Sequence, residues 1–117
     1  MAAVRIIASG ELARRSISTA LQSAGVPVAG TAADAEELLA SNGADPVETL
    51  VVTAESDPEL IEQLKLLRKR LPGARLVAIV SATTPRTLRA LLDAGTDGLV
   101  LDDRLEDQLA PTISAAR

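Results

Sequence analysis

The sequence predicts an α/β domain built on a doubly wound, five-stranded parallel sheet in a three-layer sandwich, with strand order 2-1-3-4-5. Short aliphatic runs bounded by turn-forming residues alternate with longer segments whose apolar residues recur at helical spacing. Five such strand–helix units fit into 117 residues, and right-handed crossovers place helices on both faces of the sheet. With 47% hydrophobic and 24% charged residues and no linker or repeat, we expect one domain over residues 1–117.

The predicted strands are short runs rich in Val, Ile and Leu. Two of them, TLVVT and RLVAIV, are almost continuously aliphatic, as expected for strands that helices cover on both faces. The chain contains no Phe, Tyr or Trp, so Leu, Val, Ile and Ala must fill the core. In chain order the strands are expected over Val4 to Ala8, Val26 to Gly30, Thr49 to Thr53, Arg75 to Val80 and Gly98 to Leu101.

The first two helices are predicted from an apolar face and from capping residues. The expected apolar face of the first helix comprises Leu12, Ile17, Ala20, Leu21 and Ala24. Gly25 follows at the position where a residue in the left-handed conformation would end the helix. Asp34 and Glu37 form a capping box before Leu38 and Leu39, so a second helix should begin there.

Two further helices begin with a capping residue followed by proline. Asp57 is the predicted N-cap of the third helix, with Pro58 at its first position. Thr84 and Pro85 repeat that start for the fourth helix, and Gly95 marks its end. The apolar faces are expected to consist of Leu60, Ile61, Leu64, Leu67 and Leu71 in the third helix and Leu88, Leu91 and Leu92 in the fourth.

A fifth helix should open at Asp103, which forms another capping pair with Glu106. Its apolar residues are Leu105, Leu109 and Ile113. Pro111 interrupts this pattern. Proline inside a helix removes a hydrogen bond and costs roughly 3 kcal/mol, so we predict that this helix is short or kinked.

The topology also predicts where a functional site would lie. In open, doubly wound sheets ligands bind beyond the carboxyl ends of the strands, near the switch point between the first and third strands. The residues that this rule places at the candidate site are Ala8, Ser9, Gly10, Glu11, Thr53, Ala54, Glu55, Ser81, Ala82, Asp102 and Asp103.

The composition excludes several classes of chemistry at that site. The chain has no Cys and no His, which rules out thiol nucleophiles, imidazole bases, zinc sites and iron–sulfur sites. Neither GxGxxG nor GxxxxGKS/T occurs, so nucleotide binding has no motif. We therefore expect no enzyme, no cofactor and no metal. A net charge of -4 gives no overall attraction to nucleic acid, and no apolar stretch of about 18 residues exists, so we expect a cytoplasmic protein without membrane contact.

Two long segments carry a resemblance to a known family. ARRSISTALQSAGVPVAGTAADAEELL spans the predicted first helix, second strand and second helix, and LVAIVSATTPRTLRALLDAGTDGLVLDD spans the fourth strand to the end of the fifth. At this spacing they resemble the receiver domains of bacterial response regulators, closest to the NarL/LuxR type. The resemblance implies a flavodoxin-like receiver fold and a role in two-component, phosphorelay signal transduction.

The resemblance also implies that the phosphorylation site is altered. Receivers that are phosphorylated use two acidic residues after the first strand to hold Mg²⁺, and an Asp at the end of the third strand accepts the phosphoryl group. On this sequence the acidic pair falls on Ala8 and Ser9, and the acceptor falls on Thr53. A Ser or Thr after the fourth strand is matched by Ser81, whereas the Lys after the fifth strand falls on Asp102. Since phosphoryl transfer needs a carboxylate and cations that offset developing charge, we predict that the domain does not accept aspartyl phosphate.

The family usually carries an aromatic residue in the fifth strand, which changes rotamer together with the Ser or Thr. That position is Leu99 here. The resemblance therefore implies that the usual coupling between the site and the surface is also missing.

The acidic residues near the site leave two interpretations open. They either converge on a divalent cation through oxygen ligands, or they serve as helix caps and solvated side chains, which is what we expect. These residues are Glu11, Glu55, Asp57, Asp102 and Asp103. Thr53 likewise is either a target for a Ser/Thr kinase or, as we expect, a polar strand end.

The basic run Arg68, Lys69 and Arg70 has two interpretations as well. It forms a contact patch, or it complements the dipole at the end of the third helix, and we expect the latter.

These observations together predict an atypical receiver domain that regulates by protein–protein contact, as a homodimer or with a partner protein. In the NarL/LuxR type the receiver precedes a helix-turn-helix domain, so the resemblance implies DNA contact only through such a domain, which is not visible in this chain. The chain would then be the N-terminal part of a transcription regulator or a stand-alone adaptor. Receiver families commonly associate through helix 1 with helix 5, or through helix 4 with strand 5 and helix 5.

A different class of function remains as the alternative. Small or uncharged residues at Ala8, Ser9 and Thr53 leave a less polar hollow at the switch point. A small apolar or mixed ligand would fit such a hollow, which would make the chain a ligand-binding regulatory domain.

Overall fold

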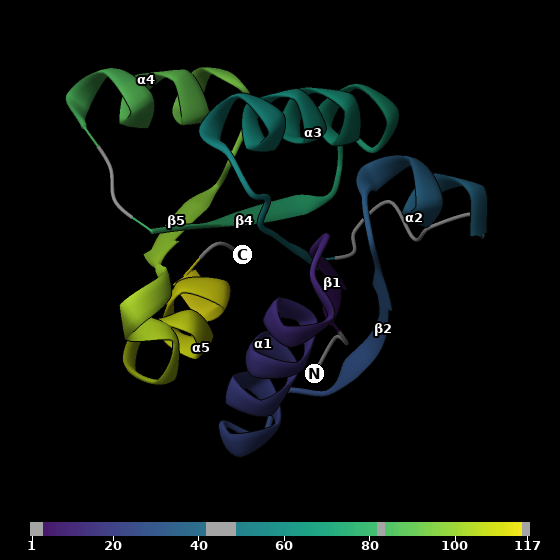
Figure 1. Cartoon of the computed structure of the whole chain (residues 1–117), viewed down its shortest axis with the longest axis vertical. Coiled ribbons are helices and arrows are strands. Elements are labelled where there is room, and N and C mark those ends of the chain that lie inside the picture. Colours follow the sequence, from purple (N-terminus) through teal and green to yellow (C-terminus); the bar gives the residue numbers. More distant parts are fainter. Residues whose placement is uncertain (1–3, 42–48, 82–83, 116–117) are drawn as a thin grey trace.

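The computed structural model describes residues 4–41, 49–81 and 84–115. These residues form a five-stranded parallel sheet in the order β2-β1-β3-β4-β5, which confirms the predicted fold class (Figure 1). The strands are β1 (Val4–Ile7), β2 (Val28–Ala32), β3 (Thr49–Val52), β4 (Arg75–Val80) and β5 (Gly98–Leu101). The helices are α1 (Glu11–Ser23), α2 (Ala35–Ser41), α3 (Asp57–Arg70), α4 (Pro85–Asp93) and α5 (Leu105–Ala115), and a 3₁₀ turn, η1 (Asp102–Arg104), precedes α5.

Helices cover both faces of the sheet and enclose an apolar core on each. α2, α3 and α4 lie over one face (Figure 1), where Leu50, Leu64 and Leu91 are fully buried. α1 and α5 lie over the other face, where Ile17 and Leu109 pack against the sheet. Every residue of the central strand β3 is buried, which is the reason for its continuous aliphatic sequence.

Strand β2 begins two residues later than predicted. Val26 was expected in the strand, but its amide donates a hydrogen bond to the Leu21 carbonyl at 2.9 Å, and the Gly25 amide donates to Gln22 at 3.0 Å. These two bonds form a Schellman motif that closes α1, and Gly25 has the predicted positive φ, +78°. Because the Val26 amide is bonded to the end of α1, Val26 does not join the sheet, and the strand starts at Val28.

Two leucines that were predicted to face the core face solvent. Leu12 is 76% exposed and Leu92 is 54% exposed. At about 100° per residue, Leu12 lies roughly 140° from Ile17 and 180° from Leu21 around α1, so it belongs to the opposite side of the helix. Leu92 lies about 100° from the buried Leu91, at the margin of the apolar face of α4.

The helix starts agree with the predicted caps in α2 and α4 and differ in α3. The Asp34 carboxylate accepts from the Glu37 amide at 2.8 Å, and the Thr84 hydroxyl accepts from the Thr87 amide at 3.2 Å. In α3 the N-cap is Ser56, whose hydroxyl accepts from the Glu59 amide at 3.3 Å.

The predicted N-cap of α3, Asp57, is therefore the first helical residue, and Pro58 is the second. Proline is tolerated there because an amide in the first turn has no intrahelical partner.

Helix α5 continues through Pro111 to Ala115, so the proline does not cut the helix short. Leu109 is buried, and Leu105 and Ile113 pack around it against the sheet. This packing offsets the hydrogen bond that proline removes. Asp103, the predicted cap, lies instead within the 3₁₀ turn before the helix.

The DAGTDG turn between α4 and β5 is held to the start of β4 by side chains. The Asp97 carboxylate accepts from the Leu76 amide at 2.9 Å, and the Thr96 hydroxyl lies 3.1 Å from the Leu76 carbonyl. The Arg68 guanidinium donates to Asp97 at 2.9 Å and to the Gly95 carbonyl at 2.6 Å. We call Arg68, Thr96 and Asp97 the amino-edge latch, because they gather where β4 and β5 begin.

Arg68 thus differs from the two exposed cations that follow it. Its guanidinium also donates to the Pro72 carbonyl at 2.9 Å and to the Ala74 carbonyl at 2.8 Å, beyond the end of α3. We expected Arg68 to complement the helix dipole, and that interpretation misses its main role. Arg68 joins the end of α3 to the loop before β4 and to the turn before β5.

Candidate functional site

A hollow of about 490 Å³ lies at the carboxyl edge of the sheet, where the topology predicts a site. Ser9, two residues after β1, and Thr53, directly after β3, line it together with Asp102, which directly follows β5. The first two turns of α1 and the start of α5 form its side walls. The remaining lining residues are Gly10, Leu12, Ala13, Ser16, Ile17, Ala54, Glu55, Ile79 and Leu105.

The ladder between β1 and β3 positions the two central residues of this hollow. β1 and β3 pair in register, Ile7 opposite Val52, and the Thr53 amide donates to the Ile7 carbonyl at 2.9 Å. This bond extends the ladder by one residue beyond β3. The side chains of Ser9 and Thr53 are therefore brought to the same edge by strands that are adjacent in space although 44 positions apart in the chain.

Ala8 does not reach the hollow. It is fully buried in the core under α1 and α5. Its amide donates to the Ala32 carbonyl at 3.0 Å, and its carbonyl accepts from the Arg14 guanidinium at 2.6 Å. The structure thus places one of the two acidic-pair positions in an apolar core, where a carboxylate would require a charged partner.

Ser81, Glu11 and Asp103 also lie outside the lining of the hollow. Ser81 is exposed at the end of β4. Glu11 pairs with Arg15 on the surface of α1 at 3.2 Å, and Asp103 lines a neighbouring groove between α1 and α5. Ala82 was also expected near the site and lies outside the described residues.

Leu99 lies on the other face of the sheet. It is half-buried and packs against the core beneath α2, α3 and α4. The neighbouring Val100 is buried in the opposite core with Leu109. The position that the resemblance assigns to the switch residue therefore contributes an aliphatic contact to the core.

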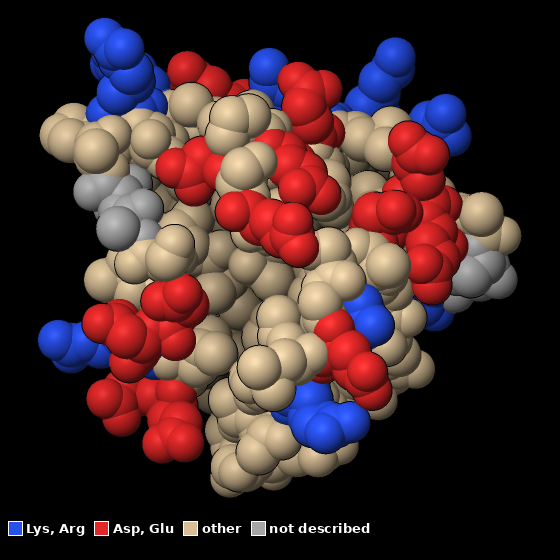
Figure 2. Space-filling model, in the orientation of Figure 1, with Lys and Arg blue, Asp and Glu red and all other residues tan. Residues whose placement is uncertain are grey.

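The hollow combines uncharged hydroxyls with carboxylates. Ser9, Ser16 and Thr53 contribute hydroxyl groups, and Glu55 and Asp102 contribute the only charges among its lining residues. Figure 2 shows this recessed surface between α1, α5 and the beginning of α3, with acidic side chains gathered over α5 on one side and near the start of α3 on the other. An anion that approaches this edge would meet charge of its own sign.

The structure also tests whether the acidic residues converge. Within residues 4–41, 49–81 and 84–115, no three acidic side chains come together in an arrangement that would hold a metal ion. In the same ranges no helix is both long enough and apolar enough to cross a membrane.

Sequence reasoning missed much of the wall of the hollow. Leu12, Ser16 and Leu105 come from helices, and Ile79 comes from β4. The rule for the switch point selects residues that follow strands, and it does not say which side of a neighbouring helix faces the site. A helical-wheel comparison of Leu12 with Ile17 would have signalled that Leu12 lies outside the core.

Comparisons with known proteins support the fold through structure alone. No family model matches the sequence, and no curated protein matches it. The isolated receiver domain of RcsB from Salmonella enterica serovar Typhimurium, in the apo form, superposes with a TM-score of 0.82 at 23% identity, covering 98% of this chain and 86% of that one. The chemotaxis response regulator CheY4 of Vibrio cholerae superposes with a TM-score of 0.80 at 22% identity, covering 100% and 99%.

The chain therefore has the fold of a response-regulator receiver domain, with the flavodoxin-like strand order. The non-phosphorylated receiver domain of RcsB from Escherichia coli is similar as well, with a TM-score of 0.79 at 20% identity over 97% of this chain and 91% of that one. A longer RcsB response regulator from Salmonella typhimurium matches with a TM-score of 0.82 at 19% identity over 97% of this chain. The present chain spans 58% of that longer protein.

Proposed function

We propose that this chain is an atypical receiver domain, which regulates by protein–protein contact and does not depend on aspartyl phosphorylation. One observation carries the proposal. At the edge where receivers would perform phosphoryl transfer, the hollow presents Ser9, Thr53 and Asp102. These side chains supply neither a carboxylate acceptor at the end of β3 nor a cation after β5.

The chemistry of the transfer gives this observation its weight. Phosphoryl transfer spreads negative charge over the phosphoryl oxygens, and enzymes offset it with Mg²⁺, Lys or Arg. Asp102 adds a negative charge where an ammonium group would be needed, and the buried Ala8 cannot hold a metal. The Thr53 hydroxyl is a weak nucleophile, and no His exists in the chain to act as its base.

The proposal assigns the chain a regulatory role and no catalytic one. We extend it to a bacterial, cytoplasmic transcription regulator, in which a helix-turn-helix domain outside residues 1–117 would contact DNA. The partner is a second copy of the chain or another protein. The exposed Leu12 on α1 supports a docking role, because a large apolar side chain gains free energy when a partner covers it.

A titration with Mg²⁺ and beryllofluoride, which mimics an acyl phosphate, tests the proposal. We expect the amide resonances of Ser9 and Thr53 in the ¹⁵N-labelled chain to remain in place. The matched control is the variant Ser9→Asp, Thr53→Asp, Asp102→Lys, which restores the acceptor, the cation and one of the two acidic residues that hold Mg²⁺, and should respond. Shifts that cluster around Thr53 in the unchanged chain would contradict the proposal.

A second candidate function is supported by the size of the hollow. A cavity of about 490 Å³ is within the range of small-molecule sites, and Leu12, Ile79 and Leu105 give it an apolar wall. The ligand would be small, with apolar and hydroxyl-bonding groups. A thermal-shift screen of metabolites would reveal it, and Ser16→Leu, which fills the hollow, should abolish the stabilisation. A compound that stabilises the unchanged chain and the Ser16→Leu variant equally does not bind in the hollow.

A further inference from the structure

Two large apolar side chains in the described part of the chain are left open to solvent. Leu12 on α1 is 76% exposed and Leu92 on α4 is 54% exposed. Single exposed leucines are common on protein surfaces and need no explanation. Here, however, each leucine lies among charged side chains, and the prevailing sign of the charge differs between the two.

Leu92 lies on a basic surface. Arg86, Arg89 and Leu92 follow one another at intervals of three residues, so they line the outer side of α4, and all three are exposed. Neither arginine forms an ion pair or a side-chain hydrogen bond with another described residue. Asp93 follows at the end of the helix and leaves an excess of one positive charge. We call this surface, Arg86, Arg89 and Leu92, the basic α4 face.

Leu12 lies on an acidic groove. A cavity of about 530 Å³ separates α1 from η1 and the start of α5, and Leu12 and Leu105 form apolar parts of its lining. The carboxylates of the lining are Asp102, Asp103, Glu106 and Asp107, against the guanidinium groups of Arg15 and Arg104. Four negative and two positive charges leave an excess of two negative charges, and Arg15 is already paired with Glu11. We call this cavity the acidic α1–α5 groove.

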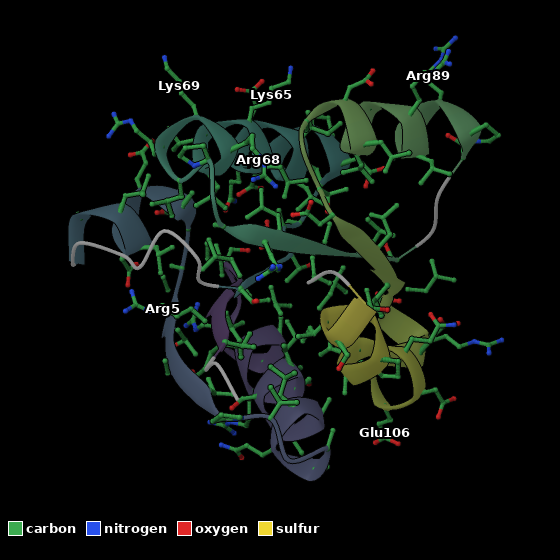
Figure 3. All side chains as sticks on the ribbon, turned by 180° about the vertical axis from the view of Figure 1, so that it is seen from behind. Arg5, Lys65, Arg68, Lys69, Arg89 and Glu106 are labelled. Carbon is green, nitrogen blue, oxygen red and sulfur yellow. The ribbon has the colours of Figure 1, made fainter. Side chains whose placement is uncertain are left out.

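The two surfaces cannot meet within one molecule. α4 covers one face of the sheet, whereas α1 and α5 cover the other (Figure 1). Figure 3 shows Arg89, with Lys65 and Lys69, pointing away from the outer side of α3 and α4, while Glu106 points away from α5 at the opposite end of the molecule. Arg68 is the exception on α3, since it turns inward to the amino-edge latch.

We propose that the basic α4 face of one copy docks into the acidic α1–α5 groove of a second copy. Leu92 then covers Leu12 and Leu105, and Arg86 and Arg89 approach the carboxylates of the groove. A second copy is the partner that the charges favour, because the same chain presents both the cationic helix and the anionic groove. The contact rests on the proposed function, in the form in which the partner is a second copy of the chain.

This geometry differs from a closed dimer. The two surfaces are different, so the contact is heterologous: in a pair, one copy keeps a free groove and the other keeps a free α4 face, and each can bind a further copy. Association should therefore continue past the dimer as concentration rises. A contact formed by one helix and one groove is small, so we expect it to be weak, detectable at about 1 mM chain, and weakened by salt because its charged rim is exposed to solvent.

Two single substitutions test the contact through the complete chain. Leu12→Lys places a cation in the groove, and Leu92→Glu places an anion on the basic face. Both residues are exposed on helices, and both replacements are good helix formers, so folding should be unchanged. The matched controls are Gln22→Lys and Gln22→Glu, which introduce the same charges at an exposed α1 position outside the groove. Sedimentation equilibrium at low and high salt measures the association.

We expect each leucine variant to lose association at least tenfold, while the Gln22 controls behave as the unchanged chain. Mixed together, the two variants should form a 1:1 heterodimer, because one keeps the basic α4 face and the other keeps the groove. If both leucine variants associate as strongly as the unchanged chain, the proposed contact is overturned, while self-association itself still stands. Loss in only one variant, or a mixture that stays monomeric, would overturn it equally. A strictly monomeric unchanged chain would overturn both the contact and the proposed self-association.

Discussion

Gly95, whose carbonyl accepts a hydrogen bond from Arg68 of the amino-edge latch, offers the sharpest test of how this fold is held. Its φ is +106°, and a Cβ built there would lie 2.8 Å from Nε and 2.9 Å from Cγ of Arg68. The Cγ atom belongs to the stem of the side chain, so Arg68 cannot avoid the methyl group by moving its tip alone. We therefore predict that Gly95→Ala both strains the backbone and displaces Arg68 from the carbonyls that it joins.

The magnitude follows from the two effects. An L-residue held at positive φ costs about 1–2 kcal/mol. Displacing Arg68 weakens its bonds to the carbonyls of Gly95, Pro72 and Ala74. At a net contribution of about 0.5–1.5 kcal/mol per hydrogen bond, losing all three would cost about 1.5–4.5 kcal/mol, and weakening them by a little under half gives a further loss of about 1–2 kcal/mol. The free energy of unfolding should fall by about 2–4 kcal/mol in total.

Gly25 supplies a matched control in the same chain. It also has positive φ, +78°, but a Cβ there would meet nothing within 4 Å. Gly25→Ala should therefore cost only the backbone strain of about 1–2 kcal/mol. Urea unfolding followed by far-UV circular dichroism measures both variants, since the chain has no Trp or Tyr to serve as a fluorescent probe.

The contact with Arg68 can be isolated by a double-mutant cycle. In an Arg68→Ala background the cost of Gly95→Ala should fall most of the way to that of Gly25→Ala, because Nε and Cγ are gone and only Cβ of residue 68, 3.2 Å away, remains. The reasoning would be refuted if Gly95→Ala were no more destabilising than Gly25→Ala, or if its cost were the same with and without Arg68.

Three further substitutions probe other parts of the fold by the same measurement. Gly98→Ala should destabilise by about 1–3 kcal/mol, because its Cβ would lie 2.7 Å from Cγ2 of Thr112 on α5, and Thr112→Ser should relieve most of that loss; no relief would contradict the contact. Ser56→Ala should lower the free energy of unfolding by about 0.5–2 kcal/mol, because α3 loses its N-cap; if Asp57→Ala were more destabilising, Asp57 would be the N-cap instead. Leu50→Ala should cost about 2–5 kcal/mol, since Leu50 is fully buried in β3, and a cost below 1 kcal/mol would show that the core collapses around the cavity.

The sheet was predictable because its signals are strong and local. The aliphatic run from Arg75 to Val80 coincides with β4, and Gly98 to Leu101 coincides with β5. The edge strand β2 was the least accurate, since its residues alternate in exposure and Val26 is used by the cap of α1. A strand covered on one side and open on the other carries a weaker signal than one that is buried on both faces.

The site was predictable only in part, because topology specifies an edge and not the direction of each side chain. Ser9, Thr53 and Asp102 meet as expected, since parallel strands end at the same edge. Ala8 precedes Ser9 by one residue and is buried in the core under α1 and α5 instead. Side chains alternate along an extended backbone, so a shift of one position decides between core and hollow.

The two edges of the sheet show why a chain can keep this fold while its site changes. At the amino edge Thr96 and Asp97 bond the backbone of β4, and Arg68 joins both to the end of α3. Replacement there would leave buried polar groups unsatisfied, which costs about 1–3 kcal/mol for each group.

At the carboxyl edge the corresponding penalty is absent. Thr53 and Asp102 line an open hollow, and their side chains make no hydrogen bond with another described residue. Replacing either side chain by another therefore breaks few native contacts. The stability of the fold thus depends on the latch more than on the side chains that line the hollow. For this reason a fold shared with receivers at 22–23% identity is compatible with the proposed absence of the charges of phosphoryl transfer.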